Sequence, residues 1–140
     1  MSLNQNLREA LKTLAHVRNF DRVLEKVTPV FADHGKVICE LKVEEEHTNR
    51  MGTVHGGFIA TLVDVVSSLA LLYTTEKRTC GVSVDMNITY TSPAKLGEEI
   101  MITAHVLKQG RKLGFAYVDL TNKATGKLIA QGRHTKYLGD

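Results

Sequence analysis

Cysteine, proline and tryptophan are scarce in this sequence. Its 140 residues include two cysteines, two prolines and no tryptophan. Cys39 and Cys80 stand far apart, and neither has a second cysteine or a histidine at metal-ligand spacing. This arrangement argues against a disulfide framework and against a zinc knuckle. We therefore expect a protein of a reducing compartment that folds without a structural metal.

The sequence also lacks the common nucleotide-binding and hydrolase motifs. It has no phosphate loop, no dinucleotide fingerprint and no Gly-x-Ser-x-Gly elbow. Lysine and arginine number 18 against 15 aspartates and glutamates, and the positive charge is scattered. Nucleic-acid binders usually cluster positive charge among aromatic residues, which make up 6% here. We therefore expect no nucleic-acid partner, whereas a small anionic ligand fits the charge balance.

Targeting signals are weak as well. Residues 1–20 lack the unbroken apolar core of a signal peptide. The segment is amphipathic and carries Arg8 and Lys12, but Glu9 and the scarcity of serine count against a mitochondrial presequence. The most apolar stretch, residues 58–75, is too short and too polar to span a bilayer, which needs about 20 mostly apolar residues. We expect a cytoplasmic protein with no integral membrane segment, with mitochondrial association as an alternative.

Hydrophobic spacing predicts a single α+β domain over residues 1–140. Leucines at helical spacing predict an N-terminal surface helix over residues 1–25, running from Leu3 to about Glu25, with Ser2 and Gln5 as its capping box. The stretch 58–75 is apolar on nearly every side and predicts a buried helix. Alternating patterns predict strands at residues 27–31, 36–43, 81–90, 99–107, 114–120 and 127–137.

This order of elements has a consequence for assembly. One long buried helix among antiparallel strands implies a twisted sheet that wraps round the helix. The edge strands of such a sheet are commonly covered by a second copy of the chain. We therefore expect a homodimer with a continuous sheet.

Asp64 lies in the middle of the apolar helix. Burying an ionised carboxylate without a partner costs several kcal/mol, so this residue needs an explanation. One interpretation is a general base that faces a cleft or a partner subunit, its pKa raised by desolvation. The alternative is a narrow solvated stripe that Asp64 shares with Thr61 and Ser68.

His55, Gly56 and Gly57 stand where a polar loop meets that helix. Glycine allows close backbone approach, and the first N–H groups of a helix have no acceptor within it. Such groups can hold an anion or a developing oxyanion. The alternatives are that the glycines serve turn geometry and that His55 is structural.

Residues 49–57 read Asn-Arg-Met-Gly-Thr-Val-His-Gly-Gly, and Asp64 follows seven residues later in the helix. This pattern resembles the active-site signature of hotdog-fold thioesterases of the phenylacetic-acid-degradation type. The similarity runs over almost the whole chain. It implies a hotdog fold, in which an antiparallel sheet wraps a long central helix, with an additional N-terminal helix. It also implies a homotetramer built as a dimer of dimers.

The same resemblance implies an active site between two protomers. Asn49, His55 and Gly56 would come from one protomer, and Asp64 and Ser83 from the other. The Gly56 N–H would polarise a thioester carbonyl, while Asp64 would activate a water that Ser83 helps to hold. Asn49 would orient the water or the carbonyl, and His55 would steady the carbonyl or the departing thiolate. A covalent anhydride through Asp64 is the alternative mechanism.

The implied substrate is a medium- or long-chain fatty acyl-CoA, and coenzyme A is then part of the substrate rather than a cofactor. The phosphates of coenzyme A suit a basic turn at residues 108–112. The alternative is that this turn is only a solvated hairpin tip. Tyr90 and Tyr137, near strand ends, would line the nucleotide or pantetheine track or have structural roles. The basic turn consists of Lys108, Gln109, Gly110, Arg111 and Lys112.

Two other functions stay open. A hotdog-fold dehydratase also acts on CoA thioesters, but its base must reach the α- or β-carbon, so the pair of Asp64 and Ser83 favours hydrolysis. A non-catalytic acyl-CoA or lipid-binding module would present its ligand to a lipid-related protein partner through the N-terminal helix.

Overall fold

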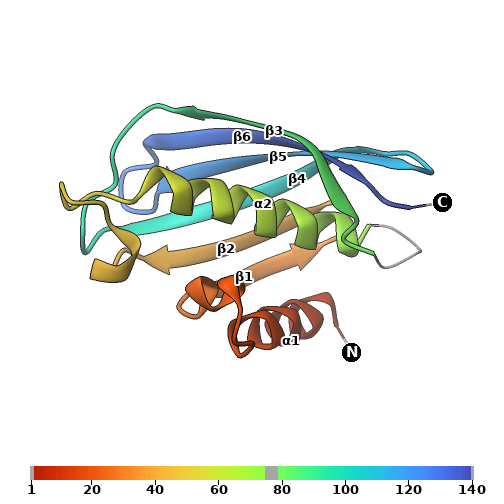
Figure 1. Ribbon diagram of the computed structural model, residues 1–140, viewed down its shortest axis with the longest axis horizontal. Coiled ribbons are helices and arrows are strands. Elements are labelled where there is room, and N and C mark those ends of the chain that lie inside the picture. The colour runs from red at the N-terminus through yellow and green to blue at the C-terminus, as the bar shows by residue number, and fades with distance from the viewer. Residues whose placement is uncertain (1, 75–78, 140) are drawn as a thin grey trace.

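The computed structural model describes residues 2–74 and 79–139, which form one sheet, two α-helices and two short 3₁₀-helices (Figure 1). The residue at the predicted end of the long helix, position 75, lies outside the described residues. In chain order the elements are α1 (Leu3–Ala15), η1 (Phe20–Leu24), β1 (Thr28–Asp33), β2 (Lys36–Lys42), η2 (Glu45–His47), α2 (Gly56–Leu72), β3 (Val82–Tyr90), β4 (Glu99–Gln109), β5 (Leu113–Asn122) and β6 (Leu128–Tyr137).

The six strands form one antiparallel sheet in the order β1-β2-β4-β5-β6-β3. Figure 1 shows α2 lying along one face of this sheet, while α1 lies outside, next to β1. The predicted hotdog fold, an antiparallel sheet around a long central helix with an extra N-terminal helix, is confirmed. None of the helices in the described part of the chain has the length and apolar character that a membrane crossing requires.

Helix α2 is held by apolar packing against the strands. Leu62, Val63 and Val66 are fully buried and belong to the same core as Ile102 of β4 and Val118 of β5. Each such side chain contributes about 1.5–3 kcal/mol relative to an exposed position. This packing fixes which face of the helix is turned away from the sheet.

The predicted burial of α2 is confirmed for most of its residues, whereas the side turned away from the sheet is partly open in the single chain. The Asp64 side chain is 46% exposed, and Thr61 and Val65 are half-buried. Ser68, predicted to share a solvated stripe with Asp64, is buried instead. The helix therefore presents a narrow open stripe, with Asp64 at its centre.

The N-terminal helix is shorter than predicted. Helix α1 ends at Ala15 rather than near residue 25, because the helical spacing of leucines stops at Leu14. Asn19 then starts the separate helix η1, and its side chain accepts a hydrogen bond from the Asp21 N–H at 2.9 Å. The predicted capping box of Ser2 is confirmed.

The strands agree with the predicted ones to within a few residues, with one consequence for the basic turn. β4 continues through Lys108 and Gln109, which pair with Phe115 and Gly114 of β5. The turn itself is therefore confined to residues 110–112. The predicted antiparallel hairpin of β1 and β2 is confirmed.

Strand β3 leaves one edge of the sheet unprotected. Val82 and Val84 are 64% and 59% exposed, although valine is an apolar residue that favours sheet interiors. The opposite edge strand, β1, has α1 packed against it. An exposed apolar edge of this kind is a pairing surface for another strand.

Gly132 allows β6 to approach α2 closely. A Cβ atom at this position would come within 2.7 Å of Val63 Cγ1 and 3.3 Å of Ile88 Cγ1. Val63 cannot turn away, because a β-branched side chain in a helix has one preferred rotamer.

We predict that Gly132→Ala lowers the free energy of unfolding by about 1–3 kcal/mol, because the methyl group overpacks this contact. Urea denaturation at one fixed protein concentration measures the loss. Arg133→Ala, on the outer side of the same strand, is the control and should change stability by about 0.5 kcal/mol or less. Equal midpoints for the two variants would contradict the close approach.

Candidate active site

His55 organises the backbone donors at the start of α2. As the N-cap, it accepts a hydrogen bond from the Gly57 N–H on Nδ1 at 2.8 Å, and its carbonyl accepts from Phe58 and Ile59. Among the first-turn N–H groups of α2 in the described residues, that of Gly56 has no hydrogen-bond acceptor. The helix macrodipole adds positive partial charge at this point. Gly56 is therefore suited to hold an oxyanion.

The same contact defines the tautomer of His55. Because Nδ1 accepts the Gly57 N–H, the ring proton lies on Nε2. The His55 side chain is exposed, so its Nε2–H is available to a ligand beside the helix start. This arrangement is compatible with the predicted donor role of His55.

Asn49 lies in the loop that leads to α2 and closes that loop with its side chain. Its Oδ1 accepts from the Met51 N–H at 2.9 Å and the Thr53 N–H at 3.3 Å, and its Nδ2 donates to Thr53 Oγ1 at 3.0 Å. An amide nitrogen carries two protons, so one remains for a ligand. The loop thereby holds a polar donor close in sequence to Gly56.

The two predicted tyrosines lie at opposite ends of the sheet. The Tyr90 hydroxyl, at the end of β3, donates to the Gly56 carbonyl at 2.9 Å, so Tyr90 lies against the helix start. Tyr137 ends β6, where its backbone pairs with Leu113 and Val82. Of the two, Tyr90 is the one that the structure brings to Gly56.

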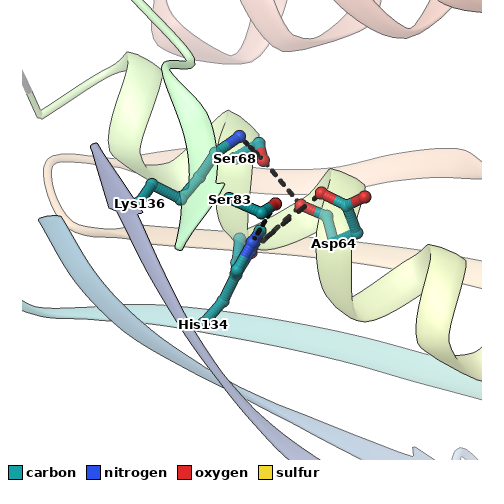
Figure 2. A network of polar contacts seen from close by, with 6 residues as sticks. Asp64, Ser68, Ser83, His134 and Lys136 are labelled. Atoms are coloured by element: carbon teal, nitrogen blue, oxygen red, sulfur yellow. Dashed lines mark hydrogen bonds and ion pairs between the residues drawn. The ribbon is translucent and has the colours of Figure 1, made fainter. Parts of the chain in front are cut away.

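A second polar cluster surrounds the middle of α2 (Figure 2). His134 of β6 lies at its centre. Its Nε2 is 2.7 Å from Ser83 Oγ, and its Nδ1 is 2.8 Å from Ser67 Oγ and 4.0 Å from Asp64 Oδ1. Ser67 also donates to the Asp64 carbonyl at 3.0 Å. His134 therefore hydrogen-bonds to Ser83 and lies 4.0 Å from the Asp64 carboxylate of the same chain, so the two predicted residues come close to one histidine.

Lys136, at the next inward position of β6 after His134, contacts the same turn of α2. Its Nζ donates to Ser68 Oγ at 2.5 Å, and Ser68 donates to the Asp64 carbonyl at 2.7 Å. His134 and Lys136 are both buried, since alternate residues of a strand face the same side. Two strand side chains thus fix the turn of α2 that carries Asp64 (Figure 2).

Burial controls the protonation of these groups. It lowers the pKa of His134 below the usual histidine value, although the Asp64 carboxylate opposes the shift. It also lowers the pKa of Lys136, again against the effect of Asp64.

Burial raises the pKa of the Cys39 thiol to about 12, so this cysteine is not a thiolate near neutral pH. In the described residues, no three His, Cys, Asp or Glu side chains gather as a metal site would require.

The two clusters are separated within one chain. Asp64 follows Gly56 by eight residues, which at 1.5 Å per residue is about 12 Å along the helix axis. A carbonyl held at hydrogen-bond distance from Gly56 is therefore out of reach of a water bound to Asp64 of the same chain.

The basic turn lies near neither the helix start nor Asn49. Its β5 neighbour Gly114 packs against Leu71, in the last turn of α2. Figure 1 shows the hairpin of β4 and β5 at the end of the sheet opposite the start of α2. Lys108, Arg111 and Lys112 are exposed there.

Sequence reasoning missed His134, Lys136 and the buried role of Ser67. The inward positions of β6 are Ala130, Gly132, His134 and Lys136, a set too polar to suggest a core-facing side. The available signal was their regular spacing of two, which places both titratable residues on the face that meets the helix.

An apolar groove adjoins the helix start. It has a volume of about 300 Å³. Phe20, Val23 and Phe58 line it, and His55 and Gly57 lie at its border. Phe20 is largely exposed.

Known proteins resemble the chain in sequence and in structure. Residues 51–129 match the family model of the thioesterase superfamily. The chain is 69% identical over 139 residues to acyl-coenzyme A thioesterase 13 of Homo sapiens, an alignment that covers 99% of each chain.

Two solved structures are similar over most of their length. Zebra fish thioesterase superfamily member 2 has a TM-score of 0.96 and 60% identity, covering 99% of this chain and 100% of that chain. A Streptococcus mutans protein solved with acetyl-CoA bound has a TM-score of 0.77 and 28% identity, covering 90% and 95% of the two chains. Sequence and fold agree, and the chain belongs to the thioesterase superfamily.

Proposed function

We propose that this protein hydrolyses medium- and long-chain fatty acyl-CoA to free fatty acid and coenzyme A. The observation that carries the proposal is the half-exposed Asp64 carboxylate, which lies 4.0 Å from the ring of His134, the residue that hydrogen-bonds to Ser83. A carboxylate and a hydroxyl fixed together in this way suit the binding and deprotonation of a water. The names of the human and zebra fish relatives, and the acetyl-CoA bound by the streptococcal protein, support the substrate class.

The proposed reaction is a direct attack by water. A water held by Asp64 and Ser83 attacks the thioester carbon, and Asp64 accepts its proton as the C–O bond forms. The Gly56 N–H donates to the carbonyl oxygen as negative charge develops there. The tetrahedral intermediate then collapses, the C–S bond breaks, and coenzyme A leaves as a thiolate that takes up a proton. Asn49 orients the carbonyl, and the His55 Nε2–H steadies the departing sulfur.

Two protomers build each site in this proposal. The separation of about 12 Å between Gly56 and Asp64 along one helix supports donors from one chain and the base from another. The exposed apolar edge of β3 supports pairing with a second copy, because an unprotected edge binds another strand. The proposed assembly is a homodimer with a continuous sheet, two of which form a tetramer.

Other surfaces support the two ends of an acyl-CoA. The groove bordered by His55 and lined by Phe20 and Phe58 offers apolar contact to a fatty chain. Lys108, Arg111 and Lys112 offer three exposed cations to the phosphates of coenzyme A. Because the groove is lined by aromatic side chains, a fatty acyl group fits it better than a charged acyl group.

We predict that the protein releases free thiol from saturated acyl-CoAs and that Asp64→Asn slows this by at least about 100-fold, since an amide cannot accept the proton of the water. A thiol reagent follows the reaction, and light scattering verifies that the variant remains assembled. Asp119→Asn, on the outer face of the sheet where its carboxylate accepts from Gln131, is the control and should keep the wild-type rate.

Two outcomes would contradict this account. If the wild type binds acyl-CoA but leaves the thioester intact, the protein is a binding module. If Asp64→Asn hydrolyses as fast as the wild type, another group activates the water.

Gly56 permits a test of the backbone donor alone. It is the first helical residue, where proline is well tolerated, and His55 before it has the extended backbone that precedes proline, with φ −62° and ψ 131°. We predict that Gly56→Pro, which deletes the N–H, lowers kcat by about 10²–10³-fold. Gly56→Ala keeps the N–H, and its Cβ would lie 3.5 Å from Tyr90, an ordinary contact. Single-turnover assays should therefore find alanine much faster than proline, and equal rates would argue against this donor.

A further inference from the structure

The hydrogen bonds around His134 have a direction, because a hydroxyl has one proton to donate. Ser67 donates to the Asp64 carbonyl, so its oxygen is left to accept from His134 Nδ1 at 2.8 Å. The Asp64 carboxylate, 4.0 Å from the same nitrogen, also favours a proton on that side of the ring. Both observations favour the tautomer with the imidazole proton on Nδ1.

With the proton on Nδ1, the other ring nitrogen is an acceptor. His134 Nε2 then accepts from the Ser83 hydroxyl at 2.7 Å, which uses the only proton of Ser83. The lone pairs of Ser83 Oγ remain. Ser83 therefore offers a substrate-side water an acceptor and no donor.

We propose that His134 is a positioning residue that holds Ser83 as a hydrogen-bond acceptor for the attacking water. This inference rests on the proposed hydrolysis and assigns to that site a residue beyond Asp64 and Ser83. Figure 2 shows Asp64 and Ser83 gathered around the His134 ring. A water between them donates one proton to the Asp64 carboxylate and one to Ser83 Oγ. Both lone pairs of the water stay unused, and one of them is free to face the thioester carbon.

Protonation of His134 would reverse this arrangement. An imidazolium donates from both nitrogens, so Ser83 would accept from Nε2–H and its own proton would be freed to point at the water. Three charged groups act on the pKa of His134: Asp64 from α2, Lys136 from β6 and Asp85 from β3. Burial, aided by Lys136, lowers the pKa of His134 against the two carboxylates. The neutral, productive form therefore persists to a lower pH than an ordinary histidine would allow, and is lost as the pH falls through that pKa.

The tautomer can be measured without any substrate. NMR of the intact protein labelled with ¹⁵N-histidine distinguishes a proton on Nδ1 from one on Nε2. The His134→Gln spectrum assigns the signal. We expect the Nδ1–H form near neutral pH, whereas an Nε2–H form would overturn the proposal whatever reaction the protein performs.

Kinetics test the consequence for catalysis. We predict that Ser83→Ala and His134→Leu each lower kcat for thiol release about 10–100-fold with little change in KM, since both leave the water poorly oriented. The double variant should be no slower than the slower single variant, because the two residues act as one unit. Additive losses would mean that His134 acts independently of Ser83, which would overturn the proposal.

Two further variants complete the test. His134→Gln keeps a polar acceptor and should retain more activity than His134→Leu, without the fall in kcat at low pH that His134 protonation causes. His105→Leu, on the outer face where His105 stacks on Tyr117, is the matched control and should keep the wild-type rate and pH profile. Thermal melts and light scattering identify a variant that fails to fold or assemble. If the wild type itself releases no thiol, the proposed hydrolysis fails, and the NMR result still decides the tautomer.

Discussion

The rise per residue of an α-helix is the constraint on which the proposed active site depends. Helix α2 carries a backbone donor at Gly56 and a carboxylate at Asp64, and eight residues keep them about 12 Å apart. A rigid helix cannot bring its own first turn to its own middle. In the proposed reaction both groups act at one carbonyl, so the donor and the base come from two different chains, and the exposed edge of β3 is where we propose that the second chain pairs.

The sheet holds that helix in a single orientation by two kinds of contact. Apolar packing buries most of α2. His134 and Lys136 also hydrogen-bond to its central turn, at Ser67 and Ser68. Buried polar groups are costly unless they are paired, and in the described part of the chain no buried side-chain nitrogen or oxygen lacks a partner. The same bonds that satisfy these groups also orient Asp64 and Ser83, so stability and positioning share one network.

Much of this structure could be predicted from the sequence, because its signals are local. The capping box of Ser2 and the apolar run of α2 follow directly from spacing, and both are confirmed. The N-terminal helix was predicted too long, because residues 16–25 contain no glycine or proline to mark its end. The strand that continues through Gln109 depends on pairing with β5, which the sequence does not encode locally.

The candidate site was only partly predictable for the same reason. Asp64 and Gly56 stand out because each breaks a local pattern. His134 does not, because it lies 70 residues from Asp64 in the chain and its strand has polar residues on the inward face. Its role follows from tertiary contacts that arise when β6 packs against α2.

Hybrid assemblies test most directly the claim that two chains build each site. Asp64→Asn and Gly56→Pro chains would be co-expressed in equal amounts, and thiol release would be compared with that of each variant alone. Random pairing makes about half of the dimers hybrid, and each hybrid keeps one intact site of two, so about a quarter of the wild-type rate should return. A mixture no faster than the average of the two variants would contradict the account, because each site would then lie within one chain.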